Sequence, residues 1–368
     1  MRQVEGPVVC CGVTGRVLVS TVKSVLVAIL FFGVGRRSFS VRSEPLYIRT
    51  YQEARIVIRN MVAVTNGKGG VLKTSLVANL AGAAALSGWD VLAIDLDPQG
   101  NLARDFGYAD DSDQGAAMAN AVIHGAPIEP MREVRPRLDV IAGGERLEDL
   151  TSELDRQALK GNQGLLLGAI ENVIAPISDR YNLILVDTPP GEALLQRAVA
   201  HASHFALVPT QPDDASIDGL NRVAIRMLEA HATNPDYDLL GVVLGPMVKS
   251  GKKLKAETEQ ELEKLLQGKW PIFESTIRLA QRAAVDCRRE GKLAHEYEQI
   301  AEAWKAGKSI SERIKDRKAG KNVKAYSSAA GGLAEDYQLL ADEILSEFTR
   351  RLAEPSSGAA PILQGVTA

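Results

Sequence analysis

The amino-acid sequence predicts an α/β fold: a doubly wound, mostly parallel sheet flanked by helices, with a helical region near the C-terminal end. Two observations lead to this prediction. From residue 61 onward, short apolar runs alternate with segments of helical periodicity, which is typical of parallel strands joined by crossover helices. The first apolar run also leads into a glycine-rich stretch, then Lys-Thr and a helix, which is the order of a phosphate-binding loop.

Each predicted element follows from its apolar spacing and from the residues that bound it. Strands are expected where short aliphatic runs stand between turn residues, at 61–65, 90–95, 138–142, 181–187, 204–209, 239–244 and 271–274. Helices are expected where apolar residues recur three or four positions apart, at 73–87, 115–124, 145–159, 165–177, 192–201, 216–231, 257–266 and 334–352. The last of these is the predicted C-terminal helix.

The composition is that of an ordinary globular chain. Its 368 residues give room for one large α/β domain, 45% of them are hydrophobic, 24% are charged, and the net charge is −3. The three cysteines, Cys10, Cys11 and Cys287, have no metal-ligand spacing. With no disulfide pattern, the cysteine content indicates a reducing, cytoplasmic compartment.

Residues 1–60 differ from the rest of the chain. They hold nine Lys or Arg and three Asp or Glu, and the apolar run 25–34 is about half of what a membrane-spanning helix needs. A signal-peptide core, a weak membrane anchor and a basic arm that touches DNA or lipid are alternative interpretations. We expect instead an N-terminal extension that is disordered or that precedes the true start at Met61. The folded domain is then expected to cover 61–353, followed by a disordered tail at 354–368.

The phosphate-binding loop departs from the common pattern G-x-x-x-x-G-K-[ST]. Gly67, Lys73 and Thr74 stand in their expected places, but Leu72 replaces the second glycine. If that position needs a positive φ, a leucine there costs about 1–2 kcal/mol. Thr74 is expected to bind Mg²⁺ through its hydroxyl. Lys68 is a second lysine in a loop that needs only one for a simple phosphate site.

Three aspartates stand at the carboxyl ends of predicted strands. Asp95 and Asp97 are two residues apart, and Asp187 ends the run 181–187. Because the carboxyl ends of parallel strands meet at one edge of a sheet, we expect these carboxylates to face the phosphates. One of the first two would hold a Mg²⁺-bound water and the other would orient an attacking water. Solvated turn acids are the alternative for each aspartate taken alone.

Four stretches together resemble the ParA family of DNA-partitioning ATPases. These are P-loop NTPases of the deviant Walker A class, which also includes Soj and MinD. The stretches are NGKGGVLKTS (66–75), DLDPQGN (95–101), ILVDTPPG (184–191) and VPTQPDD (208–214). The resemblance covers roughly 61–290 and 333–352, and 291–332 looks like an insertion or an altered DNA-facing region.

The resemblance implies a Mg²⁺-dependent ATPase. Lys68 would be the signature lysine that reaches the phosphates of a second protomer, Lys73 would hold the phosphates of its own ATP, and Asp97 would support water attack. These three are the expected catalytic residues, and the expected metal-site residues are Thr74, Asp95 and Asp187. The expected nucleotide-binding residues are Gly67, Lys68, Gly69, Gly70, Val71, Leu72, Lys73, Thr74, Ser75, Gln211, Pro212 and Asp213.

The resemblance also implies partners. An ATP-bound homodimer would bind double-stranded DNA without sequence preference, and a ParB-like centromere-binding protein would stimulate hydrolysis and release it. The expected location is the nucleoid in the cytoplasm, with no membrane partner. Because the body of the chain is acidic, a DNA surface requires local clustering of basic residues. The expected DNA-binding residues are Arg278, Arg282, Arg288, Arg289 and Lys292, with 305–324 as a second basic segment.

Two alternative functions stay open on the sequence. One is a MinD-like ATPase that positions a protein complex at a membrane. Such proteins end in an amphipathic membrane helix, whereas this chain ends in PSSGAAPILQGVTA, a poor membrane binder. The other is an ATP-gated scaffold with little hydrolysis, if Leu72 disturbs the loop.

Overall fold

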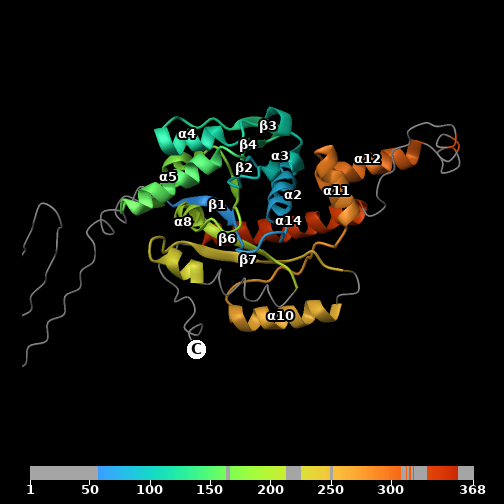
Figure 1. Cartoon of the computed structure of the whole chain (residues 1–368). Helices are drawn as coiled ribbons and strands as arrows, with labels where there is room; N and C mark the ends of the chain where they lie inside the picture. Colours follow the sequence, from blue (N-terminus) through green and yellow to red (C-terminus); the bar gives the residue numbers. More distant parts are fainter. Residues whose placement is uncertain are drawn as a thin grey trace, which may run out of the picture. The chain divides into compact units, whose positions relative to one another are not determined.

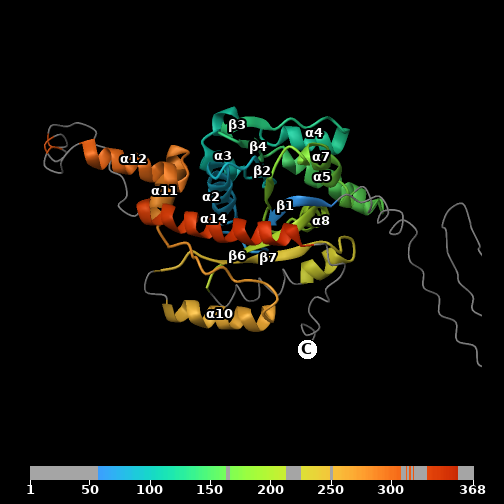
Figure 2. The ribbon, with the colours of Figure 1, turned by 180° about the vertical axis from the view of Figure 1, so that it is seen from behind.

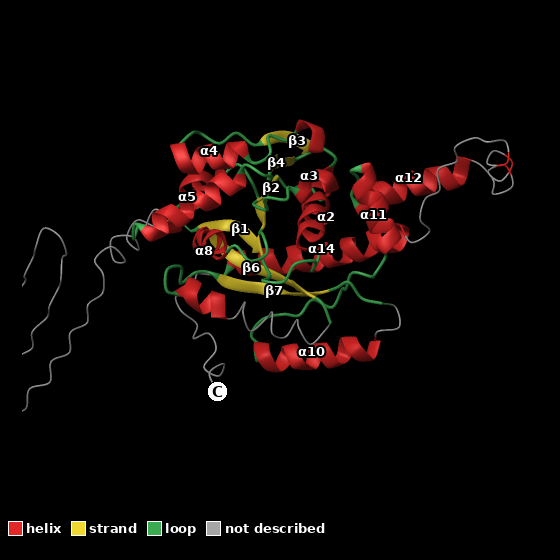
Figure 3. Cartoon of the chain, viewed as in Figure 1, coloured by secondary structure: helices red, strands yellow, loops and turns green. Residues whose placement is uncertain are grey.

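A seven-stranded sheet forms the centre of the folded part of the chain. The computed structural model describes residues 57–162, 166–212, 225–248, 252–307, 312, 315, 318 and 330–354. The strands are β1 (Ile58–Val64), β2 (Val91–Asp95), β3 (Met131–Arg135), β4 (Leu138–Ile141), β5 (Leu183–Asp187), β6 (Ser203–Thr210) and β7 (Asp238–Leu244). Their order in the sheet is β3-β4-β2-β5-β1-β6-β7 (Figure 1 and Figure 3).

The topology confirms the predicted fold class. Within the described strands, β3 pairs antiparallel with β4, and the other neighbouring pairs are parallel. The chain leaves β1, builds the sheet outward through β2 and β4, returns to the centre at β5 and then adds β6 and β7 beyond β1. The strand order therefore reverses at β1 and β5, which is where doubly wound sheets place their ligands.

Alternating side chains on β6 show how helices cover both faces. Phe205 and Leu207 join an apolar cluster with α2 (Lys73–Leu86) and α14 (Ala330–Ala353). Ala206 and Val208 point the other way, into a cluster with α8 (Ala193–Ala202) and α10 (Lys252–Leu266). This alternation follows from the two-residue period of a strand. Accordingly, α14 and α10 lie on opposite sides of β7 in both views (Figure 1 and Figure 2).

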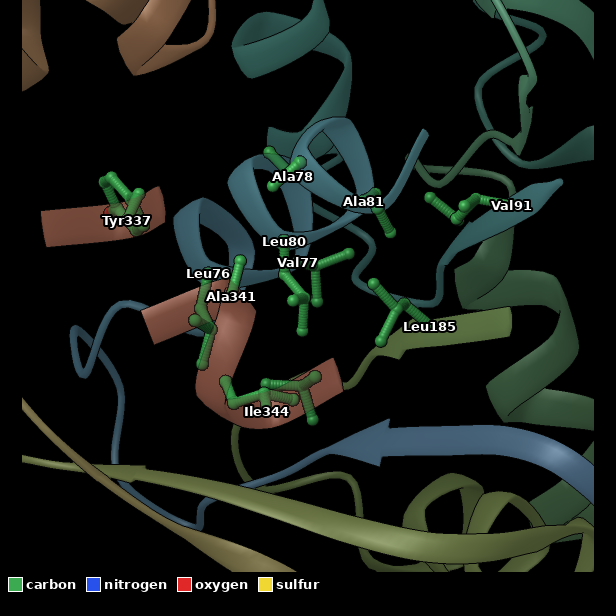
Figure 4. Packing of buried hydrophobic residues seen from close by; sticks show 14 of the residues in the cluster. Leu76, Val77, Ala78, Leu80, Ala81, Val91, Leu185, Tyr337, Ala341 and Ile344 are labelled. Carbon is green, nitrogen blue, oxygen red and sulfur yellow. The ribbon is translucent and has the colours of Figure 1, made fainter. Parts of the chain in front are cut away.

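Helix α2 is the element that carries the glycine-rich loop into the core. Its sequence KTSLVANLAGAAAL has many strong helix formers, and ten of its fourteen residues are buried. Leu76, Val77 and Leu80 pack between Leu185 of the sheet and Ile344 of α14 (Figure 4). Burying each such aliphatic side chain contributes about 2 kcal/mol. The first turn of α2 is therefore held firmly beneath the loop.

The remaining helices surround this core. They are α3 (Asn101–Phe106), the 3₁₀ helix η1 (Ala109–Asp111), α4 (Ala116–His124), α5 (Leu147–Leu159), α7 (Glu171–Ser178), α11 (Gln281–Glu290) and α12 (Ala294–Gly307). The predicted C-terminal helical region is confirmed by α11, α12 and α14. Among the described residues, no helix is both long enough and apolar enough to cross a membrane.

The structure corrects several predicted boundaries. The segment expected as one helix at 165–177 is helical at 166–167 and over Glu171–Ser178, with a turn between them. The run expected as a strand at 271–274 makes an isolated bridge from Ile272 to Val242. Helix α3 and strand β3 were not predicted. The helix expected at 216–231 is helical over 225–231, and its earlier part lies outside the described residues.

The first strand begins before Met61. Ile58 is buried, Asn60 donates from Nδ2 to the carbonyls of Ser178 and Tyr181 at 3.1 and 2.7 Å, and Arg59 donates to the carbonyl of Leu352 at 3.1 Å. Residues 58–60, expected in the N-terminal extension, thus belong to the sheet. Residues 1–56 and 355–368 lie outside the described residues.

Part of the segment 291–332 is packed into the body. The backbone N–H of Ala294 donates to Asn79 Oδ1 at 2.9 Å, and Leu293 fills the space beside Gly82 of α2. Tyr297 is 1% exposed. Leu293 and Ala294 therefore belong to the core next to α2, whereas Tyr297 and Ala301 form a smaller buried cluster with Cys287. Beyond residue 307 the described residues of this segment are 312, 315, 318 and 330–332.

Candidate functional site

The carboxyl ends of β1, β2 and β5 bring the predicted loop and acids together. Val64 stands opposite Asp187 in the parallel register of β1 and β5, and Asp95 stands opposite Asp187 in the register of β2 and β5. The phosphate loop, residues 65–72, follows β1 directly and ends at α2. Loop, helix amino terminus and two carboxylates therefore meet at one edge, as the sequence predicted.

The backbone of the loop bends where the sequence departs from the common pattern. Leu72 has φ 66° and ψ 15°, a left-handed conformation, and Gly70 has φ 77°. A left-handed backbone costs a non-glycine residue about 1–2 kcal/mol. Leu72 is half-buried and packs against the apolar cluster of α2 and α14, which offsets part of this cost. The loop keeps its shape with a leucine where a glycine is usual.

Lys73 lies underneath the loop. Its Nζ donates to the carbonyls of Asn66 and Lys68 at 3.2 and 3.0 Å. Burial lowers the pKa of Lys73, and the nearby carboxylates of Asp187 and Asp97 act in the opposite direction. The ammonium is thus placed at the centre of the loop, where it can reach a bound phosphate.

Asn66 braces the loop, a role that the sequence analysis missed. Its Nδ2 donates to the carbonyl of Pro209 at 2.7 Å, and its Oδ1 accepts from the backbone N–H of Lys68 at 2.9 Å. Asn66 is 1% exposed. The half-buried Lys68 is therefore fixed through its backbone. The sequence signal that could have identified this position is a polar residue between a buried strand and a glycine-rich loop.

Asp95 and Asp187 are buried carboxylates. Asp95 accepts backbone N–H bonds from Asp97 at 2.9 Å and Leu102 at 3.1 Å, and burial raises its pKa to about 7. Burial and the neighbouring Asp95 raise the pKa of Asp187 well above its usual range. Two neighbouring buried carboxylates favour either a proton or a cation beside them, because burial penalises their charged forms.

The donors around Asp187 fit a divalent cation. Thr74 Oγ1 donates to Asp187 Oδ2 at 2.6 Å, while the buried Oδ1 of Asp187 has no hydrogen-bond partner among the residues that the structure describes. A buried carboxylate oxygen left in this way is costly unless something binds it. Carboxylate and hydroxyl oxygens are the ligands that Mg²⁺ prefers, with phosphate and water completing its shell. The site therefore fits Mg²⁺ bound together with a polyphosphate.

Asp97 lies on the outer side of the same edge. It is half-exposed, and its Oδ1 accepts from the backbone N–H of Gln99 at 2.9 Å. Gly143 closes over this region: a Cβ atom there would lie 2.6 Å from Asp95 Cγ and 2.8 Å from the carbonyl oxygen of Asp97. The end of β4 can approach the two acids because residue 143 has no side chain. The sequence has two adjacent glycines here, Gly143 and Gly144, but it does not show that Gly143 lies against the acids.

Gln211 connects the end of β6 to the loop. Its Nε2 donates to the carbonyl of Gly70 at 3.0 Å, so this predicted nucleotide-binding residue lies at the loop. Pro212 follows it and is half-buried. Asp213, the third residue of this predicted group, lies outside the described residues.

Arg226 also reaches the loop and was not predicted. A Cβ on Gly67 would lie 3.6 Å from its guanidinium, which in turn donates to Gln196 of α8. Gln196 Nε2 donates to the carbonyl of Pro189, in the turn after Asp187, at 2.5 Å. Arg226 and Gln196 line a cavity beside Thr65. The contact spans about 160 positions of sequence, so no local pattern could reveal it.

The predicted DNA-binding residues are placed together, but three of the five are ion-paired. Arg278 binds Asp336 at 2.6 Å, Arg282 binds Asp286 at 3.0 Å, and Arg288 binds Asp105 at 2.7 Å. The other two residues of the set are the exposed Arg289 and the half-buried Lys292. A paired arginine offers less charge to a phosphate backbone, so this face is less basic than the residue count suggested.

The chain is similar in sequence to a family model and to several known proteins. Residues 59–238 match a family model described as an AAA domain. A chromosome partitioning protein ParA of Caulobacter vibrioides is 31% identical over 188 residues, which are 50% of this chain and 68% of that protein. A putative replication protein A of Rhizobium rhizogenes is 32% identical over 174 residues, 44% of this chain and 42% of the relative's length.

A solved structure shares the fold. The septum site-determining protein MinD of Pyrococcus horikoshii, in complex with Mg-ADP, has a TM-score of 0.53 at 18% identity. The alignment covers 80% of this chain and 99% of that one. At this identity the likeness shows that the two chains share a fold.

Proposed function

This chain belongs to the ParA/Soj family of chromosome-partitioning proteins, and we propose that it is a Mg²⁺-dependent ATPase that partitions DNA. The observation that carries the proposal is the arrangement around Asp187. A buried carboxylate oxygen that has no hydrogen-bond partner among the described residues, the Thr74 hydroxyl and the Lys73 ammonium lie at the amino terminus of one helix. This combination suits the β- and γ-phosphates of ATP with their cation.

In this proposal, different residues of the site have different roles in ATP hydrolysis. The backbone N–H groups of the loop and the positive end of α2 bind the phosphates. Lys73 exchanges its bonds to the carbonyls of Asn66 and Lys68 for bonds to phosphate oxygens. Thr74 and Asp187, with Asp95 beside them, would hold the cation, and a bound Mg²⁺ would supply positive charge next to the phosphates. Asp97 orients the attacking water.

Dimerisation makes the site complete. In this proposal Lys68 reaches the phosphates bound to a second protomer, so ATP joins the two copies. Its position in the loop, with the backbone held by Asn66, supports this role. We expect Lys68→Ala to retain ATP binding and to lose the ATP-dependent dimer in sedimentation. An ATP-dependent dimer formed by this variant would contradict the role.

The cargo is DNA in this proposal. An ATP-bound dimer binds double-stranded DNA without sequence preference, and a centromere-binding partner stimulates hydrolysis and releases it. The exposed Arg289 and the half-buried Lys292 are the first candidates for phosphate contacts, since Arg278, Arg282 and Arg288 already bind carboxylates.

DNA binding with and without ATP tests the proposal. We expect binding that requires ATP, tolerates any sequence and weakens steeply with salt, because phosphate contacts release counterions. The same protein is added to vesicles of anionic lipid. ATP-dependent binding to vesicles but not DNA would favour the MinD-like alternative. ATP-gated DNA binding without phosphate release would favour a scaffold with little turnover.

A further inference from the structure

A buried carboxylate joins the nucleotide site to the C-terminal helices. Asp105 lies on α3, is 7% exposed, and accepts a hydrogen bond at Oδ2 from the Ser75 hydroxyl at 3.1 Å. Arg288 of α11 approaches the same carboxylate, with Nε 2.7 Å from Oδ1 and Nη2 3.4 Å from Oδ2. One side chain therefore connects the first turn of α2 with α11.

The connection begins next to the metal site. Ser75 follows Thr74, whose hydroxyl binds Asp187 at 2.6 Å. Both residues belong to the first turn of α2, directly after the phosphate loop. Any shift of this turn on nucleotide binding would move the Ser75 hydroxyl, and with it the hydrogen bond to Asp105.

The ion pair makes this connection stiff. A carboxylate with 9% of its side chain exposed loses most of its hydration, so Arg288 is needed to compensate its charge. An arginine that approaches both oxygens of a carboxylate also fixes its orientation, which a single point charge does not. Asp105 can therefore transmit a displacement in either direction.

The backbones of α3 and α11 are also in direct contact. A Cβ on Gly291 would lie 2.3 Å from the Cα of Gly107, so the two helix ends meet through glycines. Arg135 of β3 binds both ends, donating to the carbonyls of Phe106 and Gly291 at 3.1 Å each. In both views α11 lies beside α3 and the start of α12 (Figure 1 and Figure 2).

We propose that Asp105 and Arg288 are positioning residues of the nucleotide site, which link its occupancy to the placement of the α11–α12 helices through Ser75. The inference rests on the proposed function, because it concerns the same site. It gives Arg288 a role inside the protein instead of the DNA contact that the sequence suggested. Coupling between two equilibria is reciprocal. If MgATP changes the equilibrium between two placements of α11 by some factor, then fixing α11 in one of these placements rather than the other changes MgATP affinity by the same factor.

Substitutions at the two ends of the link provide the test. MgATP affinity and DNA-free ATP hydrolysis are measured for the full chain, Ser75→Ala, Arg288→Gln and the double variant. We expect Arg288→Gln to weaken MgATP binding roughly fivefold or more, and the double variant to be no weaker than Arg288→Gln alone. Arg288→Lys should fall between, because lysine cannot bind both oxygens in a fixed plane.

The matched control is Arg137→Gln. Arg137 forms an ion pair with Asp90 at 2.9 Å, at the other end of β2 from the site. We expect this variant to bind MgATP like the parent. Thermal unfolding of each variant shows whether it folds. A loss of folded fraction lowers the maximal rate and leaves the KM unchanged, whereas a displaced first turn raises the KM.

A second readout addresses α11 itself. Amide hydrogen exchange in α11 should slow on MgATP binding in the parent and respond less in Arg288→Gln and in Gly291→Ala, which separates the helix ends without a change of charge. If the parent hydrolyses ATP while folded Ser75→Ala and Arg288→Gln match Arg137→Gln in KM and exchange, the inference is wrong. A parent that does not bind MgATP would overturn the proposed function and this inference together.

Discussion

The carboxyl edge of the sheet and the segment 278–292, which includes α11, both concentrate charged side chains, but these charges have different partners. At the edge, the first turn of α2 and the carboxylates of Asp95 and Asp187 come from three separate elements and converge on one buried point. In the segment 278–292, Arg278, Arg282 and Arg288 each bind a different carboxylate. The buried carboxylates that converge at the edge need a ligand, whereas these three arginines already have carboxylate partners within the fold.

The largest expected effect is at the edge. Asp97→Ala should bind MgATP with near-parental affinity and lose hydrolysis by about 10²-fold or more, because the attacking water is no longer oriented. Asp110→Ala, an exposed aspartate on η1, is the matched control and should retain the parental rate. Phosphate release under single-turnover conditions measures both. Parental turnover by Asp97→Ala would show that another group orients the water.

The buried acids should make the nucleotide-free protein sensitive to pH. Burial raises the pKa of Asp95 to about 7, so between about pH 4 and 7 the folded chain holds a proton that the unfolded chain has lost. Stability therefore falls as the pH rises through this range, and Asp187 acts in the same direction. Thermal unfolding from pH 5 to 8 measures it. Asp95→Asn should flatten the profile, and Asp110→Asn should not. A rising profile would contradict the assignment.

Substitutions in the segment 278–292 should have separate effects on stability and on DNA binding. Arg278 makes three hydrogen bonds to Asp336, from its backbone N–H at 2.8 Å and from Nε and Nη2 at 2.6 Å, with 29% of its side chain exposed. Arg278→Gln should lower the free energy of unfolding by about 1–3 kcal/mol. Arg289→Gln should change it by less than about 0.5 kcal/mol, while lowering the salt slope of ATP-dependent DNA binding by about one.

Urea unfolding and fluorescence anisotropy give the two quantities. If Arg278→Gln changes the salt slope as much as Arg289→Gln does, without loss of stability, the ion pair with Asp336 does not withhold Arg278 from DNA.

The smallest expected effect concerns the loop backbone. Leu72→Ala removes packing and keeps the left-handed strain, whereas Leu72→Gly removes both. We therefore expect Leu72→Gly to be more stable than Leu72→Ala by about 1 kcal/mol, measured by urea unfolding. Equal stability of the two variants would mean that the backbone at residue 72 is not left-handed in solution.

The meeting of the glycine-rich loop and the acids at one edge of the sheet could be predicted from the sequence, because its parts are local. A strand that ends in Asp, a glycine-rich loop and Lys-Thr are each contiguous, and the rule for parallel strands brings their ends together. The first residues of β1, 58–60, were missed because Arg59 and Asn60 are polar, although their side chains bind backbone carbonyls at the ends of α14 and α7. The short edge strand β3 carries too few buried residues to show a pattern.

The links between distant segments could not be predicted. Asp105 and Arg288 are 183 positions apart, and each alone looks like a solvated charge on a short helix. Their pairing depends on where α3 and α11 end, which is set by two glycines in contact, Gly107 and Gly291. Charge counting finds basic segments, but only the packed structure shows which charges are already paired.

Phosphate release from ATP by the full chain is the most direct test of the central claim, that the carboxyl edge of β1, β2 and β5 is a Mg²⁺-dependent ATP site. We expect hydrolysis that needs Mg²⁺, stops on chelation, and is lost in Lys73→Ala and Asp187→Asn while both variants remain folded. Hydrolysis that continues in both folded variants at the parental rate, or that is indifferent to Mg²⁺, would contradict the account.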